Sequence, residues 1–161
     1  MNVQERQMLV RDFHRMTGEP IKDAPEPPDE AQAVLRAKLV LEEALELAEA
    51  LGVIVMTPVR DSGEASVVDV ERVEVYPYKK PNLVAVVDAL RDLEYVIHGT
   101  EIALGVADVT DETFLEVHRS NMEKQPVDYG KKAIKPAGWK PPKIADVLRN
   151  RFPRKALLFR S

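Results

Sequence analysis

The chain has 161 residues, of which 45% are hydrophobic and 31% charged, a composition typical of one globular domain. It contains no cysteine, which excludes disulfides, thiol nucleophiles and thiolate zinc sites. No apolar run approaches the ~18 residues of a membrane span, and charges occur throughout the first residues, so we expect a cytoplasmic protein that does not enter a membrane.

The net charge of −4 conceals an uneven distribution along the chain. Residues 1–118 carry 11 basic and 24 acidic side chains, whereas residues 119–161 carry 12 basic and 3 acidic ones. An acidic body followed by a basic tail therefore has to be explained by any functional interpretation.

The hydrophobic spacing predicts a mainly helical fold. Apolar residues recur at helical intervals over residues 3–16, 30–51, 83–99 and 111–121, and the third of these helices continues or restarts through Leu104. Prolines predict an extended linker over residues 20–29, after which Asp29 is placed to cap the second helix and Gly52 to end it.

Two segments do not follow this pattern. Residues 53–80 are rich in β-branched side chains and predict a β-hairpin or an irregular insertion, with Asp61, Ser62 and Gly63 between its strands. Prolines after Gln125 exclude long helices and leave a basic, extended tail with one helical turn at residues 144–150.

Together these elements predict an all-α bundle of four to five helices that carries a short insertion. We expect an all-α catalytic domain over residues 1–125, with its insertion at 53–80, and a basic, proline-rich extension over 126–161 that packs on it. Two long helices are too few to bury both of their faces, so we expect an oligomer.

The second predicted helix carries an unusual concentration of glutamates. Glu42, Glu43 and Glu46 share one sector of its surface, and no basic residue lies between Val40 and Gly52. One explanation is a solvated face of an amphipathic helix. Like charges at this spacing are destabilising, however, which favours neutralisation by a cation or by another chain.

The third predicted helix carries a matching acidic feature. Asp88 and Asp92 lie four residues apart and so share a face, and packing of the two helices through their apolar stripes would bring both carboxylate sets to one cleft. Carboxylates are the usual protein ligands of Mg²⁺. With no cysteine and three scattered histidines, the sequence favours Mg²⁺, or Mn²⁺ as a substitute, over zinc.

These motifs resemble those of the MazG-like all-α nucleoside triphosphate pyrophosphohydrolases, whose branches include dimeric dUTP pyrophosphatases and phosphoribosyl-ATP pyrophosphohydrolase. The resemblance rests on Glu42-Glu43-x-x-Glu46, on Asp88 and Asp92, and on later segments that contain Asn121, Lys124 and Trp139. It covers most of the chain apart from residues 53–80. The sequence departs from the family pattern at Ala89, where a glutamate is usual three residues before Asp92.

The resemblance implies Mg²⁺-dependent hydrolysis of a nucleoside triphosphate, with dUTP as one candidate, to the monophosphate and pyrophosphate, as in house-cleaning of the nucleotide pool. It also implies a homodimer or a dimer of dimers. The implied catalytic residues are Glu42, Glu43, Glu46 and Asp92, and the implied metal ligands are Glu42, Glu43, Glu46, Asp88 and Asp92. Glu42 is either a ligand or the general base for the attacking water, and Asp88 is the candidate replacement for the missing glutamate.

Basic and amide side chains supply the candidate triphosphate contacts. They are Arg36, Lys38, Arg119, Asn121, Lys124, Lys131, Lys132 and Lys135. Ion pairing explains Arg36 and Lys38 equally well, and a solubilising tail is the alternative for the later lysines. For Trp139 we expect a structural role that anchors the tail to the body.

Three other functions compete with this one. Phosphoribosyl-ATP pyrophosphohydrolase shares the chemistry, although the insertion and tail make that branch less similar. A non-enzymatic helical module could use the acidic face to bind a basic partner. Nucleic-acid binding by the basic tail is disfavoured because the tail lacks interleaved aromatic residues for base stacking.

Overall fold

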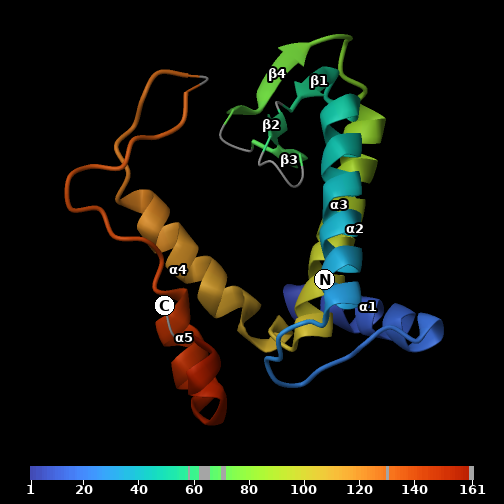
Figure 1. The fold of residues 1–161 in the computed structure, drawn as a ribbon, viewed down its shortest axis with the longest axis vertical. Coiled ribbons are helices and arrows are strands. Elements are labelled where there is room, and N and C mark those ends of the chain that lie inside the picture. Colours follow the sequence, from blue (N-terminus) through green and yellow to red (C-terminus); the bar gives the residue numbers. More distant parts are fainter. Residues whose placement is uncertain (58, 62–65, 70–71, 130, 160–161) are drawn as a thin grey trace. The chain divides into compact units, whose positions relative to one another are not determined.

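The structure is a computed structural model that describes residues 1–57, 59–61, 66–69, 72–129 and 131–159. Five α-helices occur in this described part: α1 (Val3–Thr17), α2 (Glu30–Ala50), α3 (Leu83–Leu104), α4 (Thr110–Met122) and α5 (Ile144–Arg151) (Figure 1). Two 3₁₀ helices, η2 (Ala107–Val109) and η3 (Pro153–Phe159), follow α3 and α5. The predicted all-α fold is confirmed, and α5 is longer than the single turn expected there.

The chain divides into two compact units, and the boundary falls within α3. One unit comprises Pro28–Ile97 and contains α2, the insertion and most of α3. The other comprises Met1–Pro27 and His98–Ser161 and contains the remaining helices. The functional division predicted at residue 125 is a different one and stays a prediction.

Short polar side chains begin the three longest helices. Asp29 accepts a hydrogen bond from the backbone N–H of Gln32 (2.8 Å), as predicted. Asn2 and Glu5 cap α1 reciprocally, with both side chain-to-backbone distances at 2.9 Å. At α3, Asn82 accepts from the backbone N–H groups of residues 84 and 85 at 3.2 and 3.3 Å. The local sequence therefore marks where these three helices start.

The insertion forms two short antiparallel ladders, which confirms the predicted β character. β1 (Val53–Met56) pairs with β4 (Glu74–Pro77), and β2 (Val59–Asp61) pairs with β3 (Ser66–Val68). Asp61, predicted to lie between the strands, is instead the last residue of β2 and pairs with Ser66, whereas Ser62 and Gly63 lie outside the described residues. The pairing is divided into two short ladders instead of one long hairpin. This agrees with the sequence, where polar and apolar residues alternate regularly only around Val73–Tyr76.

The unit that contains α1 has a small core where the extended linker crosses α3. Val10, Ile102 and Ala107 are buried together and Ile21 packs against them. The linker is fixed by backbone hydrogen bonds, with Lys22 N–H donating to Ile102 O and Glu26 N–H to Leu104 O, both at 3.1 Å. These bonds satisfy the carbonyl of Leu104 and give a second donor to that of Ile102, which also accepts from Gly105 N–H (3.2 Å) at the C-terminal end of α3.

The end of α4 anchors the basic tail. Ser120 is fully buried, its hydroxyl donates to the carbonyl of Lys140 (3.0 Å), and its own carbonyl accepts from the Trp139 indole Nε1–H (2.9 Å). An antiparallel bridge between Gln125 and Ile134 closes the intervening segment into a loop. The predicted anchoring role of Trp139 is confirmed.

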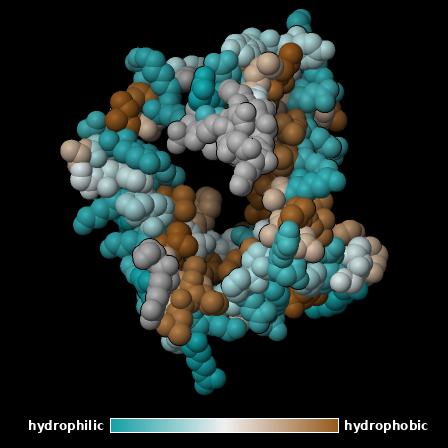
Figure 2. All heavy atoms as spheres, in the orientation of Figure 1, coloured by the Kyte–Doolittle hydropathy of each residue, from teal (hydrophilic) through white to brown (hydrophobic). Residues whose placement is uncertain are grey.

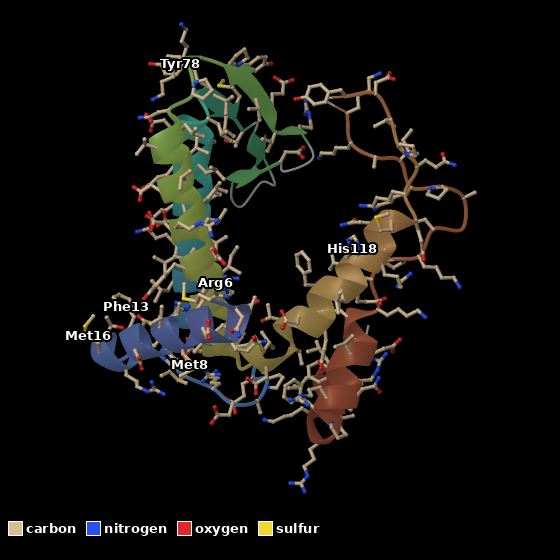
Figure 3. All side chains as sticks on the ribbon, turned by 180° about the vertical axis from the view of Figure 1, so that it is seen from behind. Arg6, Met8, Phe13, Met16, Tyr78 and His118 are labelled. Carbon is tan, nitrogen blue, oxygen red and sulfur yellow. The ribbon has the colours of Figure 1, made fainter. Side chains whose placement is uncertain are left out.

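Much apolar surface remains exposed on the helices. Figure 2 shows hydrophobic residues among hydrophilic ones across the visible face, and Figure 3 shows Met8, Phe13 and Met16 projecting from α1. On α2, Leu41 and Leu45 are 59% and 46% exposed, so the apolar stripe predicted to pack is uncovered within this chain. None of the described helices combines the length and hydrophobicity that crossing a membrane requires.

Candidate active site

Helices α2 and α3 enclose a pocket of about 350 Å³ at the end of α2 where the insertion begins. Glu46 of α2 and Asp88 and Asp92 of α3 line it. The remaining lining residues are Glu49, Ala50, Lys79, Asn82, Ala85 and Ala89. Three of the five predicted metal ligands therefore line one pocket. Glu46 is far from the two aspartates in sequence, so the packing of the two helices brings them together.

Glu43 belongs electrostatically to the same group, although it does not line the pocket. Partial burial raises its pKa above the ordinary glutamate value, and the negative charges of Glu46, Asp92 and Glu42 raise this pKa further. The influence of Asp92 shows that carboxylates of α2 and α3 are close enough to repel. The site therefore holds an excess of negative charge, which a cation would relieve.

The donor set has the chemistry of a hard divalent cation site. It consists of carboxylate oxygens, the ligands that Mg²⁺ and Mn²⁺ prefer, and it lies beside a pocket. In the described part of the chain, no three Asp, Glu or His side chains are gathered closely enough to hold a metal as they stand. Glu46 and Asp92 are exposed, so their rotamers are not fixed by packing and can adjust to a ligand.

Glu43→Gln is expected to stabilise the metal-free protein slightly. The substitution removes a charge that burial and three neighbouring carboxylates disfavour, and each like-charge pair on a helix costs on the order of 0.5 kcal/mol. Thermal unfolding in EDTA, followed by circular dichroism, should show a small rise in Tm.

Glu30→Gln is the matched control, because Glu30 lies in the first turn of the same helix, where a negative charge is favourable. This variant should lower Tm. If both substitutions lower Tm, the acidic cluster is not under electrostatic repulsion.

The remaining predicted residues of α2 have other contacts. Glu42 pairs with Lys38 one turn earlier on the helix (3.6 Å), so ion pairing accounts for Lys38 in this structure. Arg36 is buried. Neither basic residue lines the acidic pocket, and their roles in substrate binding stay predictions.

Arg119 of α4 is engaged by carboxylates. Its guanidinium makes three hydrogen bonds of 2.8–3.0 Å with Glu116 and a further ion pair with Glu123. These Arg119 hydrogen bonds, together with one from the backbone N–H of Lys143, lower the pKa of Glu116 to about 2. Glu116 therefore joins α4 to the start of α5 through its bond to Lys143 N–H (2.8 Å), and Arg119 holds the Glu116 carboxylate in place. The predicted contact of Arg119 with substrate is untested.

The lysines after α4 gather around the anchoring tryptophan. The Nζ atoms of Lys124 and Lys135 lie 5.7 and 4.5 Å from the centre of the Trp139 ring, and Lys124 donates to the Asn121 side chain (2.8 Å). Lys131 pairs with Asp128 (3.1 Å) and Lys132 is exposed. This cluster and the acidic pocket belong to different units.

Sequence reasoning missed Glu49, Lys79 and Asn82 as pocket residues. Glu49 continues the glutamate series of α2 and was recognisable as such. Lys79 lies at the end of the insertion and Asn82 just after it, and both return to the end of α2. This return depends on the pairing of β1 with β4. The Lys-Lys-Pro-Asn run before α3 was the available signal for this return.

Comparison with known protein families identifies a relationship over most of the chain. Residues 10–121 match the family model described as phosphoribosyl-ATP pyrophosphohydrolase. The chain belongs to this family. Its description identifies a hydrolase that releases pyrophosphate, which supports an enzyme over a purely structural helical module. A search of curated proteins gives no match.

The extent of the family match separates the predicted tail lysines from the other predicted site residues. It includes the whole acidic pocket and the insertion, and it ends at Asn121 within α4. Lys124, Lys131, Lys132 and Lys135 lie beyond it. Membership in the pyrophosphohydrolase family therefore bears on the carboxylates, whereas the tail lysines depend on this chain's own contacts.

Proposed function

We propose that the chain is a divalent cation-dependent pyrophosphohydrolase that cleaves a nucleoside triphosphate to the monophosphate and pyrophosphate. The observation that carries this proposal is the convergence of Glu46, Asp88 and Asp92 on one pocket in a chain of the pyrophosphohydrolase family. Mg²⁺ is the proposed physiological cation, with Mn²⁺ as a substitute.

The carboxylates have separate parts in this proposal. Glu43, Glu46 and Asp92 would hold the cation, which when bound supplies charge neutralisation and activation of water. Asp88 takes the place of the glutamate that is missing at Ala89, because Asp88 lines the pocket beside it. Glu42 is either a further ligand or the general base that accepts a proton from the attacking water.

Two substrate classes fit the proposal. The MazG-like house-cleaning branch acts on canonical or unwanted nucleoside triphosphates such as dUTP, as the sequence motifs imply. The family match favours phosphoribosyl-ATP as the second candidate, because this compound appears in the family's description. Both carry a triphosphate chain, so the same carboxylate site serves either.

A substrate panel tests the proposal directly. Purified protein should be incubated with the ribo- and deoxyribonucleoside triphosphates, dUTP and phosphoribosyl-ATP, with Mg²⁺ or with EDTA, and the products separated by ion-exchange chromatography. We expect a monophosphate and pyrophosphate with Mg²⁺ and neither with EDTA. Absence of cation-dependent turnover of every substrate, or release of orthophosphate instead, would contradict the proposal.

We also propose that copies of the chain associate as a homodimer or a dimer of dimers. The support is the exposed apolar stripe on the two long helices, where Leu41 of α2 and Val87 of α3 are each more than half exposed. Exposed apolar surface of this kind is characteristic of interaction sites. A second copy would bury it and complete the bundle.

A further inference from the structure

The backbone at the end of the insertion is fixed to the end of α2. The carbonyl of Gly52 accepts hydrogen bonds from the N–H groups of Tyr78 (2.8 Å) and Lys79 (3.1 Å), and Asn82 N–H donates to the carbonyl of Ala50 (3.0 Å). Gly52 has φ of +77°, and a Cβ on it would lie 2.1 Å from the carbonyl oxygen of Lys79. The close approach requires glycine and places the Lys79 backbone precisely.

This placement brings the Lys79 side chain to the acidic pocket. Among the described lining residues Lys79 is the one cation, beside the four carboxylates of Glu46, Glu49, Asp88 and Asp92. Its Nζ contacts Glu49 Oε1 at 2.9 Å and lies 5.9 Å from the centre of the Tyr78 ring. Figure 3 shows Tyr78 at the end of the helix pair where the insertion returns.

The ion pair of Lys79 with Glu49 can be replaced by another anion at little cost in stability. The side chains of Lys79 and Glu49 are 44% and 73% exposed, and ion pairs this exposed contribute little stability. A phosphate oxygen can therefore replace the Glu49 carboxylate at small cost. The ammonium group also lies at the C-terminal end of α2, where the helix dipole favours a positive charge.

We propose that Lys79 is a phosphate-binding residue of this pocket, supplied by the 53–80 insertion, and that Glu49 competes with the substrate's polyphosphate for its ammonium group. The proposal rests on the proposed function for the identity of the anion. A polyphosphate approaching four carboxylates needs positive charge beyond the cation, and Lys79 provides it from a fixed backbone position. The insertion thereby acquires a role in substrate binding.

The test uses inorganic tripolyphosphate, which carries the phosphate chain without base or sugar. Isothermal titration in Mg²⁺ should show that Lys79→Met weakens tripolyphosphate binding roughly ten- to a hundredfold, the change expected for loss of one charge-assisted hydrogen bond. Lys79→Arg should retain most of the affinity. Glu49→Gln should tighten binding, because the competing carboxylate is gone.

Lys80→Met is the matched control, since it removes the same charge from the adjacent residue, which does not line the pocket. It should leave tripolyphosphate affinity within about threefold of wild type, allowing for the longer-range electrostatic effect of one surface charge. Far-ultraviolet circular dichroism should show unchanged total helix content in each variant, which controls for loss of the fold. Equal losses in the Lys79→Met and Lys80→Met proteins would overturn the proposal, since only general charge would then matter.

Turnover distinguishes failure of this inference from failure of the proposed function. With a triphosphate that the wild type hydrolyses, Lys79→Met should raise KM by the same factor and leave kcat nearly unchanged. If the wild type hydrolyses triphosphates and Lys79→Met behaves as wild type, Lys79 is not a phosphate ligand although the function stands. If tripolyphosphate binding depends on Lys79 but nothing is hydrolysed, the site assignment stands and the enzymatic function fails.

Discussion

Glu46→Gln and Asp92→Asn are each expected to reduce cation-dependent triphosphate hydrolysis by at least about a hundredfold. Both side chains line the pocket between α2 and α3, one from each helix, and both are proposed to hold the cation. Loss of a residue that merely supports a metal ligand already costs about 10–100-fold, so loss of a ligand should cost more. Initial rates of pyrophosphate release, measured over a range of Mg²⁺ concentrations, give the effect.

Both substitutions preserve side-chain size and remove only charge, so the fold should be retained. Far-ultraviolet circular dichroism should show unchanged helix content in each variant. Glu30→Gln changes the same residue type on α2 away from the pocket and should retain wild-type rates to within about threefold. Full turnover in both the Glu46 and the Asp92 variants would show that the catalytic site lies elsewhere.

Gly105→Ala is expected to be among the most destabilising single substitutions in the unit that contains α1. Gly105 has φ of +72°, and a Cβ on it would lie 2.1 Å from the carbonyl oxygen and 2.4 Å from the carbonyl carbon of Ala24. The linker would have to move away from the end of α3. We expect a loss of about 1–2 kcal/mol from the backbone conformation and about 1–3 kcal/mol more from this overlap.

Gly18→Ala is the control that measures the loss of stability from the backbone conformation alone. Gly18 ends α1 with φ of +75°, and a Cβ there would meet no atom within 4 Å. Urea denaturation followed by fluorescence of Trp139, the single tryptophan, reports on this unit. A larger loss in the Gly105 variant isolates the overlap, whereas equal losses would mean that the linker does not pack against Gly105 as described.

The helices were predictable because local rules determine them. Asp29 and the capping glycines mark helix ends wherever the chain is placed, and the glutamate series on α2 defines an acidic sector by periodicity alone. The prediction that Asp88 and Asp92 of α3 lie near the glutamates of α2 needed one further assumption, that the two helices pack together. Their shared pocket agrees with it.

The features that escaped prediction depend on contacts between distant residues. Lys79 reaches Glu49 across thirty residues because two strands pair in one register, and β-branched composition does not specify that register. An uncovered apolar face was expected, but not that it would include Leu41 and Leu45. Periodicity identifies an apolar stripe without saying whether this chain or a second copy covers it.

The carbonyl of Gly52 accepts hydrogen bonds from the N–H groups of both Tyr78 and Lys79. The insertion therefore begins and ends at the same peptide group beside the end of α2. Residues added to or lost from the far ladder of β2 and β3 would not alter the spacing of the two long helices. One residue added within α2, by contrast, would turn every following glutamate by about 100° around the helix axis. Homologues should therefore differ in the length of the β2–β3 segment but not in the length of α2.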